Sequence, residues 1–182
     1  STQRQLDEGL EEVKKAQTLD PLSPQINRAV GEVFYYMGQY DEALEESRRA
    51  LEMDPNLRGT HNTLTMTYWA KGMHEEAIAQ SKKWASVDPS AASVAPVVLR
   101  SLASGNRTEA ITAIRDSAQL ATYWKAVYYA LVGEKEKALE GMTQAINERD
   151  PNSPWFNIEP AFDPLRDDPR FQNLLRRMNF EP

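Results

Sequence analysis

Apolar side chains recur every three or four positions along most of this chain, and polar side chains fill the positions between them. Val30, Phe34 and Met37 show the spacing clearly. A period near 3.6 places such residues on one face of an α-helix, whereas a half-buried strand would alternate apolar and polar residues. No segment shows that alternation. The pattern therefore predicts an all-α fold.

Two further markers indicate that the helices come in repeated pairs. Asp-Pro pairs begin at Asp20, Asp54 and Asp88, with equal steps between them. Four glycines are each followed five positions later by an alanine; the glycines are Gly38, Gly72, Gly105 and Gly133, and the alanines are Ala43, Ala77, Ala110 and Ala138. Proline moves the preceding residue out of the helical region and can itself begin the next helix. One unit is therefore predicted to hold a helix, a turn at glycine, a second helix and an Asp-Pro stop.

These features resemble the tetratricopeptide repeat, a family of 34-residue helix pairs whose length equals the step between the Asp-Pro pairs. With Pro55 and Pro89 at the family's proline position, its small positions are held by Gly31, Ala43 and Ala50, and its aromatic position by Phe34 and Tyr68. Small residues are needed where the helix axes approach to about 8 to 10 Å. Thr65 and Trp84 depart from the Gly and Ala usual there. The resemblance implies a right-handed α-α superhelix, or solenoid, of about four helix pairs, with an orphan N-terminal helix and a C-terminal capping helix.

We expect residues 1–182 to form a single domain of such repeats. Residues 1–21 are predicted to be the second helix of a truncated unit, 22–55 the first repeat, 56–89 the second, 90–118 a degenerate third, 119–152 the fourth, and 153–182 the C-terminal capping segment. The third unit is degenerate because Ala110 and Ala138 are closer together than Ala43 and Ala77. The chain starts without Met and with a second helix, so we expect further sequence upstream of Ser1.

Composition narrows the range of functions. Lys and Arg number 21 against 27 Asp and Glu, a formal charge of −6, which argues against a nucleic-acid partner because phosphates are bound by clustered basic residues. The absence of cysteine excludes disulfides, thiolate metal sites and cysteine nucleophiles. No run approaches the roughly 20 apolar residues that span a bilayer, so this segment is not expected to insert into a membrane. A cytoplasmic location is favoured, with an extracytoplasmic one open if a transmembrane segment lies upstream.

The sequence offers no catalytic or metal-binding motif. His61 and His74 fall on different predicted helices of the second unit, whereas two metal ligands on one helix face would be three or four positions apart. Motifs for phosphate binding, dinucleotide binding and a nucleophilic serine are also missing. Adjacent carboxylates such as Glu45 and Glu46 are typical of a solvated helix face. We therefore expect no enzyme activity, no catalytic residue, no metal and no cofactor.

The resemblance also implies a binding surface, because in this family the first helix of every unit lines a concave groove. The residue after the core aromatic points into that groove, which places Tyr35 and Trp69 there. The complete expected set of partner-binding residues is Arg28, Glu32, Tyr35, Asn62, Met66, Trp69, Arg100 and Tyr123. Exposed Tyr, Trp and Arg are typical of binding hot spots. The alternative for Trp69 is a structural role, packed on a neighbouring helix.

A subgroup of the family holds acidic C-terminal tails of heat-shock chaperones with a clamp of Lys, Asn and Arg. Arg28 stands where a Lys would be, but Glu32 stands where an Asn would be, and a glutamate repels a carboxylate. The expected ligand is therefore a protein segment that combines apolar or aromatic side chains with some basic character.

The leading interpretation is a non-catalytic scaffold that binds a peptide or helix of a protein partner in the groove. Residues 159–178 resemble the endings of repeat regions in bacterial signalling proteins, which favours a docking or sensor region of such a protein. Homodimerisation through the N-terminal helix is an alternative, because its apolar stripe of Leu6, Leu10 and Val13 lacks a preceding neighbour.

A third interpretation is a small-molecule sensor that controls an attached kinase, cyclase or DNA-binding module. Its pocket would lie between the third and fourth units, lined by Tyr123, Trp124, Tyr128 and Tyr129. A repacked core would explain the same aromatic residues.

Overall fold

The computed structural model describes residues 2–180, and every regular element in that range is a helix. The predicted all-α fold of packed helix pairs is therefore confirmed. The chain divides into two compact units, each larger than a single repeat, and the word unit has this meaning from here on. The first unit ends at Asp88 and the second begins at Pro89. This division falls within one residue of the expected boundary between the second and third repeats. The assignment of all repeats to a single domain stays a prediction.

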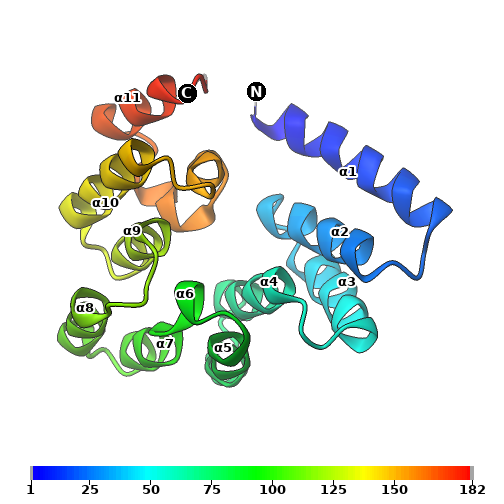
Figure 1. Cartoon of the computed structure of the whole chain (residues 1–182), viewed down its shortest axis with the longest axis horizontal. Coiled ribbons are helices and arrows are strands. Elements are labelled where there is room, and N and C mark those ends of the chain that lie inside the picture. Colours follow the sequence, from blue (N-terminus) through cyan, green and yellow to red (C-terminus); the bar gives the residue numbers. More distant parts are fainter. Residues whose placement is uncertain (1, 181–182) are drawn as a thin grey trace. The chain divides into compact units, whose positions relative to one another are not determined.

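The first unit contains five helices (Figure 1), namely α1 (Thr2–Leu19), α2 (Pro24–Tyr36), α3 (Tyr40–Met53), α4 (Arg58–Ala70) and α5 (His74–Val87). Helices α2 and α3 form one hairpin, and α4 and α5 form the next. Helix α1 packs against α2, α3 packs against α4, and the two first helices α2 and α4 contact each other. The unit is thus two stacked hairpins preceded by a single helix.

The second unit is less regular. It contains α6 (Pro89–Ala92), α7 (Ala95–Ala103), α8 (Arg107–Asp116), α9 (Thr122–Leu131), α10 (Lys135–Glu148), the 3₁₀ helices η1 (Ser153–Asn157) and η2 (Pro160–Leu165), and α11 (Pro169–Arg177). Helices α7 and α8 form a hairpin, as do α9 and α10. Phe156, Phe162 and Phe171 from the last three elements join the core that α9 and α10 begin.

Each hairpin turns at the glycine that the sequence indicated. Gly38, Gly72, Gly105 and Gly133 have φ values of 74°, 73°, 76° and 76°, a backbone region that favours glycine. At the first turn the N–H of Gly38 donates to the carbonyl of Tyr35 at 3.0 Å, and the N–H of Gln39 donates to that of Phe34 at 2.9 Å. The same pair of bonds recurs at the other three turns. This arrangement satisfies carbonyls that would otherwise be left unpaired at the helix end.

The repeat period is also visible in the helix limits. Helices α2 and α4 begin one repeat length apart, and α1, α3 and α5 end at Leu19, Met53 and Val87 with the same step. Helices α10 and α11 begin one repeat length apart as well, at Lys135 and Pro169. Between these two helices, η1 and η2 occupy the stretch of chain where a first helix would be expected. Helix α11 therefore begins at the sequence position where the second helix of a repeat would begin.

The helices of a hairpin approach closely at small residues. A methyl group added at Gly31 would lie 2.7 Å from Ser47 Oγ and 3.2 Å from Ser47 N, so α2 and α3 have room for hydrogen only. Ala43 and Ala50, at the predicted small positions of α3, are fully buried. In the α9–α10 hairpin, a methyl group at Gly141 would lie 3.0 Å from Ala126 Cβ.

The close contact at Gly31 predicts that Gly31→Ala lowers the free energy of unfolding by about 1 to 3 kcal/mol, because overpacking outweighs the better helix propensity of alanine. Gly9 in α1 is a matched control, since a methyl group there meets no atom within 4 Å. Gly9→Ala should raise stability by about 0.5 to 1 kcal/mol. Urea unfolding curves measure both values, and a change of the same sign at the two glycines would contradict the packing argument.

Candidate functional site

Six of the predicted binding residues lie on α2 and α4, the first helices of the two hairpins in the first unit. They occupy equivalent positions one repeat length apart, as Arg28 and Asn62, Glu32 and Met66, and Tyr35 and Trp69. On each helix the three residues are spaced by three or four, so they share one face. Because α2 packs directly against α4, the two stripes lie on neighbouring helices.

Tyr35 and Met66 do not offer the exposed side chains that we expected, being only 3% and 5% exposed. The Tyr35 ring packs against those of Tyr36 and Tyr40, with centroids 5.1 and 6.3 Å away. The expectation of exposure is corrected, because a residue that points away from its own helix axis can still be covered by neighbouring side chains.

Arg100 and Tyr123 belong to the second unit. Tyr123 is 2% exposed and packs against Phe156 in a tilted arrangement, with ring centroids 4.9 Å apart, so its expected exposure is also corrected. Arg100 is exposed on α7 and forms an ion pair with Glu109 at 2.7 Å.

The aromatic cluster suggested for a small-molecule pocket forms part of the packed interior of the second unit. Tyr128 is 1% exposed, and its hydroxyl donates to the carbonyl of Ala91 at 3.0 Å. Trp124 meets Tyr123 edge to face, with centroids 5.1 Å apart, and Tyr129 packs at the edge of the same core. These contacts favour the repacked core over a ligand pocket.

Arg28 and Glu32 form an ion pair beside α4. Arg28 Nη1 donates to Glu32 Oε1 at 2.5 Å, and the two side chains stay 31% and 21% exposed. A methyl group at Gly59 would lie 3.0 Å from Arg28 Nη1 and 3.1 Å from Glu32 Oε1, so glycine lets the pair lie against the first turn of α4. Sequence reasoning missed Gly59. A glycine within a predicted helix was the available signal, because it often marks a close approach.

The electrostatics of this pair bear on the expected repulsion of carboxylates, which stays a prediction. Burial raises the pKa of Glu32, while the Arg28 guanidinium acts in the opposite direction. The negative charge of Glu32 is compensated by Arg28, so the pair presents both signs to a ligand.

Asn62 and Trp69 complete the accessible part of this surface. Asn62 lies one turn beyond Gly59, and its Oδ1 atom is enclosed without a hydrogen-bond partner among the described residues. Trp69 is partly exposed, and one face of its indole stacks on His74 with centroids 4.4 Å apart. We call the accessible set Arg28, Glu32, Asn62 and Trp69 the α2–α4 face.

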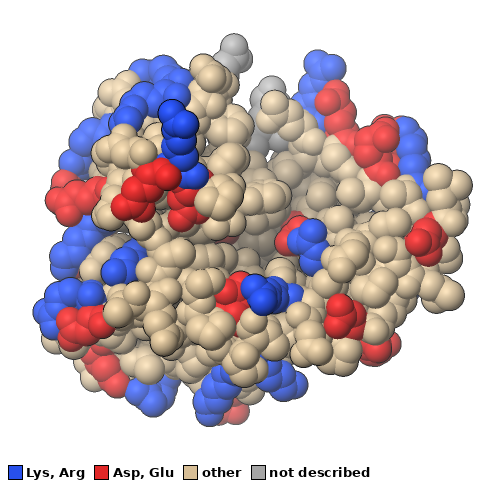
Figure 2. All heavy atoms as spheres, in the orientation of Figure 1, with Lys and Arg blue, Asp and Glu red and all other residues tan. Residues whose placement is uncertain are grey.

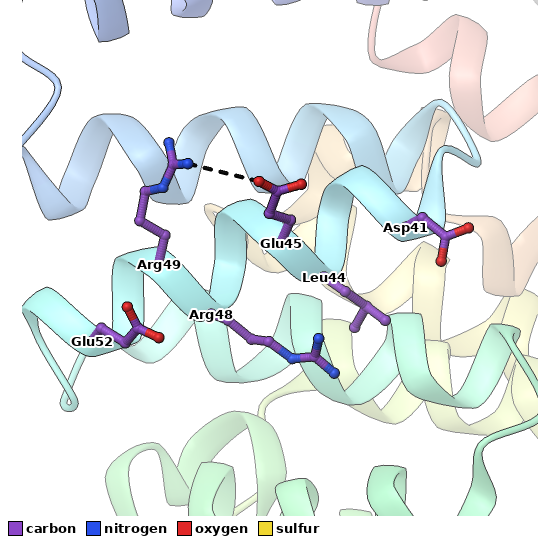
Figure 3. A pocket seen from close by; sticks show the side chains of 6 residues that line it. All are labelled: Asp41, Leu44, Glu45, Arg48, Arg49 and Glu52. Carbon is purple, nitrogen blue, oxygen red and sulfur yellow. Dashed lines mark ion pairs between the residues drawn. The ribbon is translucent and has the colours of Figure 1, made fainter.

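A second candidate is a hollow of about 470 Å³ on α3 (Figure 3), lined by Asp41, Leu44, Glu45, Arg48, Arg49 and Glu52. Its cations already have partners within the first unit. Arg48 Nη2 donates to the Tyr68 hydroxyl at 2.9 Å, and Arg49 pairs with Glu45 at 3.7 Å and with Glu46 at 3.5 Å. The Arg48–Tyr68 contact joins α3 to α4, whereas the two Arg49 pairs lie within α3.

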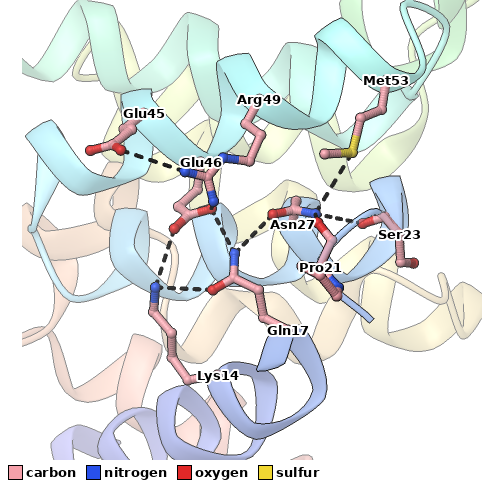
Figure 4. A network of polar contacts seen from close by, with 9 residues as sticks. All are labelled: Lys14, Gln17, Pro21, Ser23, Asn27, Glu45, Glu46, Arg49 and Met53. Atoms are coloured by element: carbon pink, nitrogen blue, oxygen red, sulfur yellow. Dashed lines mark hydrogen bonds and ion pairs between the residues drawn. The ribbon is translucent and has the colours of Figure 1, made fainter. Parts of the chain in front are cut away.

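A partly buried polar network connects α1 to the first hairpin (Figure 4). Gln17 Nε2 donates to Asn27 Oδ1 and to Glu46 Oε2, both at 2.8 Å, and Lys14 Nζ donates to Glu46 Oε1 at 3.2 Å. Asn27 is fully buried and donates to the carbonyls of Pro21 and Ser23 at 3.0 and 2.8 Å. The network is therefore structural.

The apolar stripe of α1 bears on the predicted homodimer. Leu6, Leu10 and Val13 are partly buried, on a helix that packs against α2. Packing within the chain therefore covers part of this stripe. Homodimerisation stays a prediction.

Both ring nitrogens of His61 have hydrogen-bond partners within the first unit. The carbonyl of Pro55 can only accept, so it fixes the proton on His61 Nε2 at 2.8 Å, and Gln80 Nε2 donates to Nδ1 at 2.7 Å. Across residues 2–180 no three His, Asp or Glu side chains are grouped to hold a metal ion. In the same range no helix combines the length and apolar character that a membrane crossing requires.

The sequence of the first hairpin is similar to a known family of repeats. Residues 29–57 match the family model of the tetratricopeptide repeat. The match includes most of α2, the turn at Gly38 and all of α3. No curated protein matches the chain. Tetratricopeptide repeats generally mediate protein–protein interactions and are typically non-catalytic scaffolds.

The burial of Glu32 predicts a pH dependence of stability. Its raised pKa means that the folded chain holds this proton at a pH where the unfolded chain has released it, so stability falls as pH rises above about 4.5, the ordinary value. Glu32→Gln removes this loss, and the stability of the variant relative to the wild type should increase with pH.

Glu11 supplies a control of opposite sign. Lys15 lowers the pKa of this exposed carboxyl, so the stability that Glu11 adds is present above its ordinary pKa and is lost as pH falls. Glu11→Gln should therefore become less stable relative to the wild type as pH rises. Urea unfolding from about pH 3 to about pH 7, a range of roughly four units that extends below and above the ordinary glutamate pKa, measures both trends. Parallel trends would refute the assignment for Glu32.

The network around Asn27 predicts that Asn27→Ala lowers the free energy of unfolding by about 1 to 3 kcal/mol, because buried carbonyl and amide groups lose their partners. Gln25→Ala, an exposed change on the same helix, should stay within about 0.5 kcal/mol of the wild type. Hydrogen exchange should show faster exchange in α1 for Asn27→Ala alone. Unchanged exchange in α1 would mean that the network does not hold this helix.

Proposed function

We propose that this chain is a non-catalytic scaffold that binds a peptide or helix of a protein partner through the α2–α4 face. The proposal rests chiefly on the enclosed Oδ1 atom of Asn62, which has no hydrogen-bond partner among the described residues. An acceptor left unpaired beneath the surface costs about 1 to 3 kcal/mol, and a rotation of the partly exposed Asn62 amide would bring Oδ1 to the surface, where a backbone N–H or a lysine of a ligand recovers this cost.

The neighbouring side chains define the chemistry of the ligand. Trp69 offers a partly exposed indole, which suits an apolar or aromatic side chain. Glu32 accepts a hydrogen bond from Arg28 through Oε1. Its Oε2 atom would accept a hydrogen bond from a basic group of the ligand. The ligand class is therefore a polypeptide that carries an aromatic or apolar residue and a basic residue beside an accessible N–H donor.

The C-terminal run over residues 159–178 supports a wider setting for this scaffold. Its resemblance to repeat regions of bacterial signalling proteins suggests that the chain serves as the docking region of a larger protein of that kind. The match of the first hairpin to a repeat that generally mediates protein–protein interactions is consistent with this role.

The proposal is tested by placing the photocrosslinker p-benzoylphenylalanine at position 69 in cells of the source organism. A matched control carries it at Lys83, an exposed position on α5. We expect a protein adduct from position 69 that the control lacks and that Asn62→Leu abolishes. With the adduct partner purified, Asn62→Leu should weaken binding by about 2 kcal/mol, a loss of roughly thirtyfold in Kd.

Three outcomes would reject the α2–α4 face as the binding surface. They are equal adducts from both positions, an adduct that Asn62→Leu leaves unchanged, and no adduct at all. An adduct only between copies of the chain would support self-association in place of partner binding.

A further inference from the structure

A second surface lies in the other unit, where a hollow of about 380 Å³ runs between α10 and α11. Its lining residues are Glu136, Leu139, Glu140 and Thr143 of α10, and Arg170, Asn173, Leu174 and Arg177 of α11. Each residue of the second set follows its counterpart by one repeat length. Each set also has the spacing of a single helix stripe. The groove is thus formed by two equivalent helix faces.

The two helices run parallel along this groove. At their beginnings, Arg170 donates to both carboxylate oxygens of Glu136 at 2.7 and 2.9 Å. Near their ends, Arg177 Nη2 donates to Asn147 Oδ1 at 2.8 Å. The ion pair closes the first end of the groove with a charged bridge, and the stretch toward Thr143 and Arg177 stays available.

The floor of the groove is apolar. Leu139 and Leu174 belong to the core of the second unit and turn only their edges toward the groove. The Thr143 hydroxyl donates to the carbonyl of Leu139 at 2.8 Å within its own helix, which leaves the methyl group for contact. A ligand would therefore meet aliphatic surface between the two rims.

The rims carry opposite charges. Glu140 on the α10 rim is exposed and has no hydrogen-bond or ion-pair partner among the described residues. Arg177 on the α11 rim is bonded to a neutral amide, so its charge is uncompensated. Figure 2 shows both basic and acidic side chains over α10 and α11. An acidic rim facing a basic rim disfavours a polyanion and favours a ligand that carries both signs.

We propose that this groove binds an amphipathic α-helix of a protein partner, with a basic flank toward Glu140 and an acidic flank toward Arg177. Side chains of the size of leucine or methionine, repeated every three or four positions, would contact Leu139, Thr143 and Leu174. A helix suits the site because the ridges of one helix pack into the groove that two others leave. This surface is separate from the α2–α4 face and does not depend on its function.

Three designed helical peptides of about 18 residues with the same leucine stripe test the proposal, a length of roughly five turns. One peptide has a lysine flank and a glutamate flank, the second has lysine on both flanks, and the third has glutamate on both. Fluorescence anisotropy with the full chain should show about tenfold tighter binding of the mixed peptide than of either other peptide. The comparison holds for either direction of the bound helix, because reversing the helix only exchanges its flanks.

Variants of the chain locate the binding. Glu140→Lys makes both rims basic and should transfer the preference to the all-glutamate peptide. Thr143→Arg fills the groove and should abolish binding. Gln144→Arg adds the same charge at the next, exposed position outside the lining and should leave binding unchanged.

Equal binding of the three peptides, binding that survives Thr143→Arg, or no binding of any peptide would overturn the proposal. Light scattering of the chain alone distinguishes a second copy as the occupant. Self-association that Thr143→Arg abolishes and Gln144→Arg preserves would assign the groove to another copy of this chain, and would equally overturn the partner helix.

Discussion

The structure depends on the close approach of the two helices within each hairpin. At Gly31, α2 and α3 leave room for a hydrogen atom only, because Ser47 lies directly opposite. In the α9–α10 hairpin, Gly141 and Ala126 meet in a similar way. The left-handed glycine turns reverse the chain between the two helices of each hairpin. Both candidate surfaces follow from this packing, since it fixes which stripe of each helix is left for a ligand.

The fold could be predicted largely from the sequence, because its signals are local. The glycine turns, the Asp-Pro stops and the helical period each act over a short stretch of chain. Gly31 was also predictable as a point of close approach, since a glycine within a helix is costly unless packing requires it. The family match to residues 29–57 covers the hairpin in which these signals are most complete. Further on, Thr65 and Trp84 hold positions that Gly31 and Ala50 occupy in the first hairpin, so the pattern weakens there.

The candidate site was less predictable, because exposure depends on segments that are distant in sequence. The repeat register placed Tyr35, Met66 and Tyr123 on first helices, but it could not show that their side chains are buried. It identified Arg28 and Glu32 without revealing that they pair over Gly59. The sequence analysis did not predict the α10–α11 groove, although the lining residues of the groove recur with the period of the repeats. That signal becomes visible only after α11 is recognised as equivalent to α10.

The spacing of α10 and α11 has a consequence for protein engineering. Helix α11 keeps its place in the series although η1 and η2 replace the helix that would normally precede it. The step of one repeat length between α10 and α11 is thus kept although the connecting residues have another conformation. A designer could exchange residues 153–165 for a regular helix of suitable length and extend the array by further modules, with α11 retained as a graft point.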